Sequence, residues 1–432
     1  MSRLRALINN RIVRNFIVLF TGEGVVSIIG MINLAIIVNT IGNEKNGIII
    51  MVQTYSLLFS GIFGFKSFQA LIKYMPVSIE EGNEELTKQY VKQSFVLDIG
   101  AAAVATVFGY ICLDFVCNLM GWDSSMKPYI KMFLITLIIN IQGTPIGVLR
   151  IFNKFNYITY SNVVSNLLKL TLYVLAFITH QGFQFFFIVE IIFTVMFNII
   201  LIVFTFITLK QQGLGGFYKG PLKLDRDFFM FNFYSNITST IDIPVGSITT
   251  MVINRYLGFT EISIYKIFDK IGSVIGKLSS PLNQIIYPEM SIMIAKKKFL
   301  KAKKMSDKLL MGISLIGAAF IFFILITHKW WLGIFIKDYD VYLWSLVIYL
   351  VYMIFSNGSQ GVHSLFMALG YIKLTVPIII CVNSAYLVLL YFSIKAWHLN
   401  GVLISLILQA VAVVVIKIII MKKNHYMEKV QK

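Results

Sequence analysis

Three lysines share one face of a long apolar segment in the second half of the chain, between residues 262 and 287. At about 100° per helical residue, Lys270 and Lys277 fall about 40° and about 20° from Lys266, along a stripe about 16 Å long. An ammonium group inside a membrane costs on the order of several kcal/mol unless it faces water or a partner. Asp269, in the same segment, can offset one of the three charges. The spacing therefore predicts a water-filled cavity of positive potential that attracts an anionic ligand.

A structural explanation of the same lysines stays open. Lys266 can extend to the membrane interface while Lys270 pairs with a carboxylate such as Asp242, which would leave no charge for a ligand. Asp242 belongs to the preceding segment, which also places polar side chains on one side and thus favours an aqueous wall over a lipid-facing one. These neighbours are Asn232, Ser235, Asn236, Ser239 and Gly246.

Other cationic residues extend the candidate binding set to Lys169, Lys66 and Arg255. Lys169 lies near the middle of an apolar segment that carries further polar residues at helical spacing, which indicates a second wall of the cavity. Lys66 lies at a depth similar to that of Glu23, so these two residues form either a structural ion pair or a coupling site. Arg255 lies at the outer end of the segment before the lysine stripe.

Three carboxylates are candidates for ion coupling, namely Glu23, Asp242 and Asp269. Two others, Asp98 and Glu190, lie within about two turns of a predicted helix end. At such positions we expect the side chain to reach the interface or to accept an interfacial hydrogen bond. Asp98 and Glu190 are therefore left outside the predicted site.

Composition identifies the solvent around these residues. The chain has 432 residues, of which 57% are hydrophobic and 13% are charged, and its mean hydropathy is +0.79. An ordinary soluble domain has about 45–50% apolar and about 25% charged residues. A soluble fold is excluded, because only a lipid-facing surface can itself be this apolar. The sequence thus predicts an all-α integral membrane protein.

A helix needs about 20 apolar residues to cross a bilayer, and this criterion predicts about twelve spans. They cover residues 16–40, 47–72, 93–116, 129–149, 158–179, 185–209, 229–256, 262–287, 309–328, 341–365, 375–394 and 401–420. The first span is too long for the apolar core of a signal peptide, so we expect it to be retained. Most Lys and Arg residues lie in alternate connections, which predicts that both termini are cytoplasmic.

The predicted spans form two halves of six helices each. Residues 1–209 are expected to form an N-terminal lobe, residues 210–228 a glycine-rich cytoplasmic linker, and residues 229–432 a C-terminal lobe. The first span ends in Val38–Gly42 and the seventh in Asn254–Gly258, a weak internal likeness. Six helices is an even number, so the two lobes are predicted to share one orientation, as in a two-lobed carrier.

The sequence also excludes several kinds of chemistry. It contains no G-x-x-x-x-G-K-[ST] phosphate loop, and no H-E-x-x-H or G-x-S-x-G motif. The three cysteines, Cys112, Cys117 and Cys381, lack metal-ligand spacing. We expect no catalytic residue, metal or cofactor, and hence a transporter rather than an enzyme. The basic residues lie in short connections instead of a soluble domain, so nucleic acid is not an expected partner.

The chain resembles the polysaccharide flippases of the multidrug, oligosaccharidyl-lipid and polysaccharide exporter superfamily along nearly its whole length. In the first half the likeness is carried by the first hairpin and by Lys73–Pro76. In the second half it is carried by Ile241-Asp242, Asn254–Gly258, Tyr265 and Ile286–Ser291. Related flippases often have an arginine just before the glycine that ends the first helix, where this chain has Asn39 and Thr40. Lys66 or Lys169 would then have to replace it.

The resemblance implies two six-helix lobes in a V around a cationic cavity that opens alternately to the two faces of the membrane. The implied substrate is an oligosaccharide on undecaprenyl pyrophosphate, moved to the outer leaflet of a bacterial cytoplasmic membrane for O-antigen, capsule or a similar polymer. Implied partners are membrane lipids, a polymerase and other polysaccharide-assembly proteins. Two alternatives stay open, a multidrug cation antiporter of the same superfamily and a membrane polysaccharide polymerase or glycosyltransferase.

Overall fold

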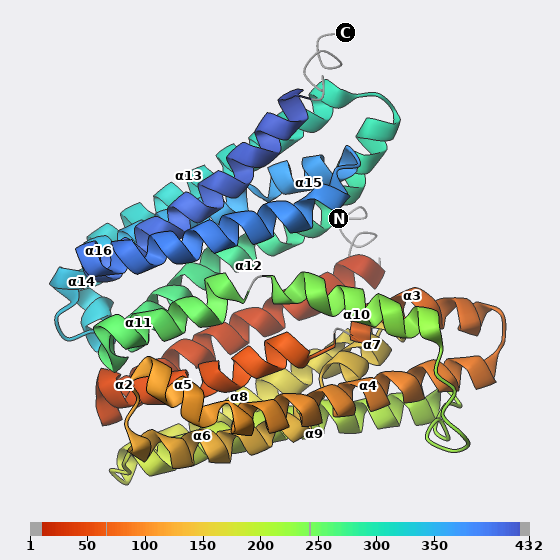
Figure 1. Ribbon diagram of the computed structural model, residues 1–432, viewed down its shortest axis with the longest axis horizontal. Coiled ribbons are helices and arrows are strands. Elements are labelled where there is room, and N and C mark those ends of the chain that lie inside the picture. Colours follow the sequence, from red (N-terminus) through yellow and green to blue (C-terminus); the bar gives the residue numbers. More distant parts are fainter. Residues whose placement is uncertain (1–10, 66, 242, 424–432) are drawn as a thin grey trace, which may run out of the picture. The chain divides into compact units, whose positions relative to one another are not determined.

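The structure is a computed structural model that describes residues 11–65, 67–241 and 243–423. All regular elements within these ranges are helices, and they form two compact units, Met1–Ile243 and Pro244–Lys432 (Figure 1). The predicted all-α fold is therefore confirmed. The number of membrane spans, the side of the termini and the lobe limits at residues 209 and 229 remain predictions.

The first unit combines long apolar helices with short ones at their breaks. In chain order its elements are α2 (Arg11–Phe63), α3 (Ser67–Glu80), α4 (Glu84–Ile111), α5 (Leu113–Met120), η1 (Ser124–Met126), α6 (Lys127–Leu134), η2 (Ile135–Ile139), α7 (Gly143–Ile151), α8 (Phe155–Ile178), α9 (Phe183–Gln211) and α10 (Arg226–Thr240). Local sequence explains the start of α4. The Asn83 side chain accepts a hydrogen bond from the Leu86 N–H at 3.0 Å, and Glu84 and Glu85 oppose the positive end of the helix dipole.

The second unit begins with a short π-helix and continues with longer helices. Its elements are η3 (Pro244–Ile248), α11 (Thr249–Leu257), α12 (Phe259–Ala295), α13 (Phe299–Trp331), η4 (Leu332–Ile334), α14 (Tyr339–Gly358), α15 (Gln360–Ala368) and α16 (Ile372–Lys423). The last of these consists of two helical segments that meet at Trp397 and His398, between the eleventh and twelfth predicted spans, and contact each other through Ser393 and Ser405. Within the described residues, each predicted span falls mainly on helical segments, although several are divided among two or three elements.

The two sequence segments that resemble each other end in glycines of almost the same backbone conformation. Gly42 interrupts α2 with φ 83° and ψ 164°, and Gly258 separates α11 from α12 with φ 94° and ψ −176°. This region of backbone space is essentially restricted to glycine. Among the described residues, no heavy atom beyond the glycine's own neighbourhood in the chain lies within 4 Å of a Cβ placed at either glycine, so the backbone and not the available space requires glycine there. The internal likeness thus includes a shared turn geometry.

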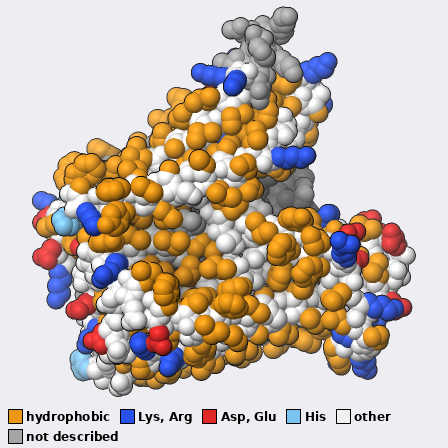
Figure 2. Space-filling model, viewed as in Figure 1, with side chains coloured by type: hydrophobic (Ala, Val, Ile, Leu, Met, Phe, Trp, Pro, Cys, Tyr) orange, Lys and Arg blue, Asp and Glu red, His pale blue; other side chains and the backbone are white. Residues whose placement is uncertain are grey.

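The outer surface of the helices is suited to lipid. Eight helices of the described residues are long and apolar enough to cross a membrane. Hydrophobic side chains cover much of the face drawn in Figure 2, whereas most charged side chains visible there lie near its edges. Large apolar side chains such as Ile111, Phe322 and Phe392 are more than 60% exposed. The chain is therefore a multi-pass membrane protein, because this much exposed apolar surface is stable in lipid and not in water.

The glycine-rich connection before α10 is bound to α4. Gln93 donates to the Asp225 carbonyl at 2.9 Å and accepts from its N–H at 3.0 Å. Gln89 donates to the Pro221 carbonyl at 3.2 Å, and the Lys92 ammonium bonds to the Gly220 carbonyl. A connection held by Gln89 and Gln93 of α4 is more ordered than its glycine content predicts. This segment positions the start of α10 against α4.

Candidate functional site

Two neighbouring helices of the first unit are interrupted at the same place, beside Asp98 of α4. At one break α2 gives way to α3, and at the other η2 gives way to α7. Asp98 Oδ1 accepts from the Ser67 hydroxyl at 2.5 Å, and Oδ2 accepts from the N–H and the hydroxyl of Thr144, both at 2.7 Å. The first N–H groups of a helix have no partner within it. Asp98 satisfies donors at both new helix starts and opposes the positive ends of both dipoles.

A glycine permits this close approach. A Cβ at Gly143 would lie 3.0 Å from Asp98 Oδ2 and 3.2 Å from the Ser67 backbone nitrogen. Real Cβ atoms rarely tolerate such contacts with backbone atoms, so a larger residue would push α7 away from the carboxylate. The sequence around the break, with Gly64 and Gly143, is the signal that could have revealed it.

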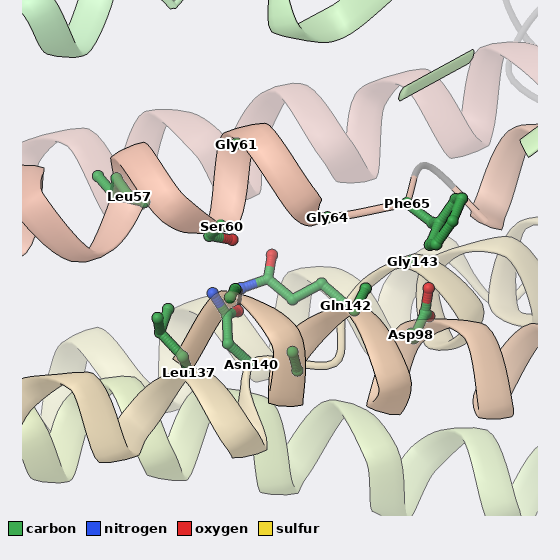
Figure 3. Close-up of a pocket in the computed structure, with 13 residues that line it drawn as sticks. Leu57, Ser60, Gly61, Gly64, Phe65, Asp98, Leu137, Asn140, Gln142 and Gly143 are labelled. Carbon is green, nitrogen blue, oxygen red and sulfur yellow. Dashed lines mark hydrogen bonds between the residues drawn. The ribbon is translucent and has the colours of Figure 1, made fainter. Parts of the chain in front are cut away.

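The interrupted helices enclose a pocket of about 360 Å³ (Figure 3). One wall consists of small residues, and the polar side chains come from both breaks and from α4. The Gln142 side chain extends across the pocket, and its Nε2 donates to Asn140 Oδ1 at 2.7 Å. The pocket is lined by Leu57, Ser60, Gly61, Gly64, Phe65, Asp98, Ala101, Ala102, Ala105, Leu137, Asn140, Gln142 and Gly143.

Helix α10 covers the other side of the α2 break. The Asn236 amide donates to the Ile62 carbonyl at 3.0 Å, and the Thr240 hydroxyl donates to the Gly61 carbonyl at 3.3 Å. These carbonyls lie in the last turn of α2, where they have no partner within the helix. Part of the polar stripe predicted to face water thus binds backbone atoms that the break exposes.

A second polar network surrounds Glu190 of α9. The Lys169 ammonium lies 2.6 Å from Glu190 Oε1, and the Tyr173 hydroxyl donates to the same oxygen at 2.5 Å. Gln53 of α2 donates to Oε2 at 3.2 Å. The side chains of Lys169 and Glu190 are 16% and 8% exposed. The network joins three helices, and in this conformation the charge of Lys169 is neutralised inside the protein.

The expectation for the two carboxylates left outside the site is wrong. Asp98 and Glu190 are 7% and 6% exposed, and each is fixed by side chains of other helices instead of reaching an interface. For Asp98 the error came from the helix end, because α4 begins at Glu84, well before the predicted start at residue 93. For Glu190 the start of α9 at Phe183 was predicted within two residues, and the error came from its partners on α8 and α2. The helix length that buries Asp98 could not be obtained from hydropathy, since the first turns of α4 are charged.

The lysine stripe lies on α12, as the periodicity predicts. The Lys266 ammonium is 3.7 Å from Asp269 Oδ2, and the Tyr349 hydroxyl of α14 donates to Asp269 Oδ1 at 2.9 Å. The side chains of Lys266 and Asp269 are 33% and 48% exposed, so this pair is accessible. Lys270 and Lys277 are half-buried. Between residues 262 and 287, α12 carries three ammonium groups and one carboxylate, so its formal charge there is positive.

The other predicted residues are exposed or lie outside the described part of the chain. Arg255 is exposed in the last turn of α11, and Glu23 is exposed in the first part of α2. Lys66 and Asp242 lie outside the described residues. The predicted pairing of Glu23 with Lys66, and that of Lys270 with Asp242, therefore stay predictions. Within residues 11–65, 67–241 and 243–423 there is no group of His, Cys, Asp and Glu side chains arranged to hold a metal ion.

Sequence comparison assigns the family. Residues 12–294 match the family described as polysaccharide biosynthesis protein. The chain belongs to this family. A relative, the inner membrane protein YghQ of Escherichia coli (strain K12), is 23% identical over 283 residues, which cover 65% of this chain and 80% of the relative. The predicted resemblance to the polysaccharide transporters of the superfamily is confirmed.

Solved structures show the same fold. An inward-facing multidrug resistance transporter of the MATE family superposes with a TM-score of 0.72 at 13% identity, over 92% of this chain and 94% of its own. The Vibrio cholerae MATE transporter VcmN gives 0.65 at 12% identity over 99% of both chains. A Pyrococcus furiosus superfamily member, described as having a binding pocket of reversed polarity, gives 0.64 at 13% identity, over 98% and 96%. Family and fold together identify a multi-pass membrane protein of a polysaccharide biosynthesis family that has the fold of MATE transporters.

Proposed function

We propose that this chain is a flippase that moves oligosaccharide units linked to undecaprenyl pyrophosphate from the inner to the outer leaflet of the bacterial cytoplasmic membrane by alternating access. The observation that carries the proposal is the cationic face of α12 in a member of a polysaccharide biosynthesis family. A diphosphate is a compact anion of at least two charges, which Lys266 and Lys270, one helical turn apart, can contact together, and Lys277 continues the same face two turns further on. The units carried would supply O-antigen, capsule or a similar surface polymer.

In this proposal the predicted residues have distinct roles. Lys266, Lys270 and Lys277 bind the diphosphate, with Lys66, Lys169 and Arg255 as further cationic positions along its route. Glu23, Asp242 and Asp269 are the candidates for ion coupling. Because Lys169 is paired with Glu190 in this conformation, it can bind a phosphate only after that pair has separated. The proposed partners are the lipid-linked substrate, membrane lipids and the polymerase and assembly proteins that use the flipped unit.

The test compares two triple variants, each of which removes three positive charges from a different part of the chain. The triple variant Lys266→Gln, Lys270→Gln, Lys277→Gln should abolish surface polysaccharide in a strain that depends on this gene, while the protein still reaches the membrane. The control variant Lys296→Gln, Lys301→Gln, Lys304→Gln removes three exposed lysines after α12 and at the start of α13. It should retain most of the polysaccharide. Normal polysaccharide in the first variant would refute the proposed role of the cationic face.

Export of organic cations is the second candidate, because the fold is shared with multidrug transporters of the MATE family. Such a cargo needs acidic and aromatic groups, whereas α12 has a positive formal charge between residues 262 and 287. Gradient-dependent efflux of a cationic dye from vesicles containing the purified protein would favour this function. An absence of dye efflux, with flipping of the lipid-linked oligosaccharide in the same vesicles, would exclude it.

A further inference from the structure

The pocket at the helix breaks differs in chemistry from the lysine stripe. Its polar lining comes from the amides of Asn140 and Gln142 and the hydroxyl of Ser60, and Asp98 is its charged lining residue. Asp98 already accepts three hydrogen bonds from the starts of α3 and α7. Its charge is thus directed at two helix dipoles. The polar groups left for a ligand are mainly neutral.

The remaining groups include both hydrogen-bond donors and acceptors. Each primary amide has two N–H donors and a carbonyl oxygen with two lone pairs, and a hydroxyl can do both. The bond between Gln142 Nε2 and Asn140 Oδ1 orients both amides and uses one donor and one lone pair. A metal ion would use only oxygen ligands, and a phosphate would use only donors. A ligand with several hydroxyl groups uses all of these groups at once.

The shape of the pocket fits one ring of such a ligand. Its volume of about 360 Å³ lies in the range of small-molecule sites, about 300–1,000 Å³. Ala101, Ala102 and Ala105 of α4 keep one wall flat, and the Phe65 ring lies at one end beside Asp98 (Figure 3). An aromatic face next to orienting amides can cover the apolar C–H side of a sugar ring while the amides bind its hydroxyls.

We propose that this pocket is a subsite for one sugar ring of the transported molecule, with Gln142 and Asn140 as the residues that contact its hydroxyls. This inference rests on the proposed function and divides substrate recognition in two. The lysines of α12 bind the charged diphosphate, and the pocket of the first unit binds the uncharged sugar. Asp98 is a positioning residue, because it holds the two helix starts that bring Phe65 and Gln142 to the pocket.

Two adjacent alanines of α4 provide a matched pair of variants. Ala102 lines the pocket, whereas Ala103 is exposed and lies outside the lining. Ala102→Leu fills the pocket, and Ala103→Leu adds the same atoms to the outer surface. A third variant, Gln142→Met, keeps a side chain of similar length but removes the amide. Proteoliposomes with each variant would be tested with two probes, the lipid-linked oligosaccharide from a strain lacking the transporter and undecaprenyl pyrophosphate without sugar.

The expected result is selective loss. With the sugar-bearing probe, Ala102→Leu should lower the initial flipping rate about tenfold or more. Gln142→Met should raise the KM about threefold to tenfold at an unchanged maximal rate, because a hydrogen bond made equally in all states is lost. With the sugar-free probe both variants should equal the wild type, and Ala103→Leu should equal it with both probes.

The same assay distinguishes failure of the flippase function from failure of the sugar subsite. Wild-type protein that moves neither probe would refute the flippase function, and the sugar subsite with it. Wild-type protein that moves the probes, while Ala102→Leu and Gln142→Met leave sugar discrimination unchanged or impair both probes equally, would refute the subsite alone. If Ala102→Leu elutes as aggregate in detergent, Gln142→Met decides the question by the same comparison.

Discussion

The buried pair between Lys169 and Glu190 should contribute to stability only as a pair. In Lys169→Met the Glu190 carboxylate loses its counter-ion, and in Glu190→Gln the Lys169 ammonium is left without one, whereas the double variant contains neither charge. The ions are 2.6 Å apart and 16% and 8% exposed. At an effective dielectric constant of about 20, their attraction is about 6 kcal/mol before desolvation is subtracted.

Removing one partner of a buried pair lowers the free energy of unfolding by about 3–5 kcal/mol, because the other charge stays buried. We expect each single variant to lose about this much and the double variant to lose about 1 kcal/mol or less, since replacement of both charges is often neutral. The coupling energy should then be several kcal/mol. The exposed pair of Lys88 and Glu84, 2.5 Å apart on one turn of α4, should give a coupling energy of about 0.3–0.5 kcal/mol.

Chemical unfolding in detergent micelles, followed by circular dichroism, would provide both double-variant cycles. The two cycles use the same chain, the same assay and the same kinds of side chain, so burial is the main difference between them. Equal coupling energies for the two pairs would refute the argument. The argument would also be refuted if the double variant lost as much free energy of unfolding as the two single variants lose in sum, because the two charges would then act independently.

Three further outcomes follow from the geometry. Gly258→Ala should lower the free energy of unfolding by about 1–3 kcal/mol, because alanine is strained in the backbone conformation of Gly258. Gly312→Ala, in open space within α13, should raise the free energy of unfolding by up to about 1 kcal/mol, because alanine is the better helix former. Thermal unfolding of the two variants measures both effects. Gln93→Ala removes two bonds to Asp225 and should speed tryptic cleavage of the linker, and an unchanged cleavage rate would show that these bonds do not hold it. Asp98→Leu leaves three donors unsatisfied and should cost more than about 3 kcal/mol, whereas unfolding at the wild-type denaturant concentration would contradict its role at the helix starts.

Backbone requirements that act within a few residues were visible in the sequence. Val38–Gly42 and Asn254–Gly258 resemble each other as short strings, and their glycines adopt almost the same conformation. A positive φ is a local property of one residue, so a glycine at a matching place predicts it without knowledge of the fold. The lysine stripe of α12 is likewise confirmed as a face of one helix, because helical periodicity alone decides which residues share a face.

Contacts between helices could not be obtained in the same way. Glu190 of α9 contacts Lys169 of α8 and Gln53 of α2, which lie 21 and 137 residues away in the sequence. Asp98 meets residues 31 and 46 positions away. In both cases the sequence favoured a carboxylate near an interface. For Asp98 the reason is that hydropathy locates apolar stretches and not the start of a helix such as α4, which begins with charged turns. For Glu190 the reason is that its partners lie on other helices. Gly64 and Gly143 were visible in the sequence, but they become informative only when the two helix breaks are known to lie side by side.

By itself, the sequence determined that lipid surrounds this protein, that its helices cross the membrane, and that positive charge follows one face of the segment before residue 287. These properties depend on composition and on the period of a single helix, and both can be counted along the chain. Only the tertiary structure decided that Lys169 is neutralised by Glu190 and that Asp98 joins two interrupted helices beside a pocket. Those features depend on which helices are neighbours and on how far each helix is displaced along its axis relative to the next. Side-chain packing across the whole unit determines both.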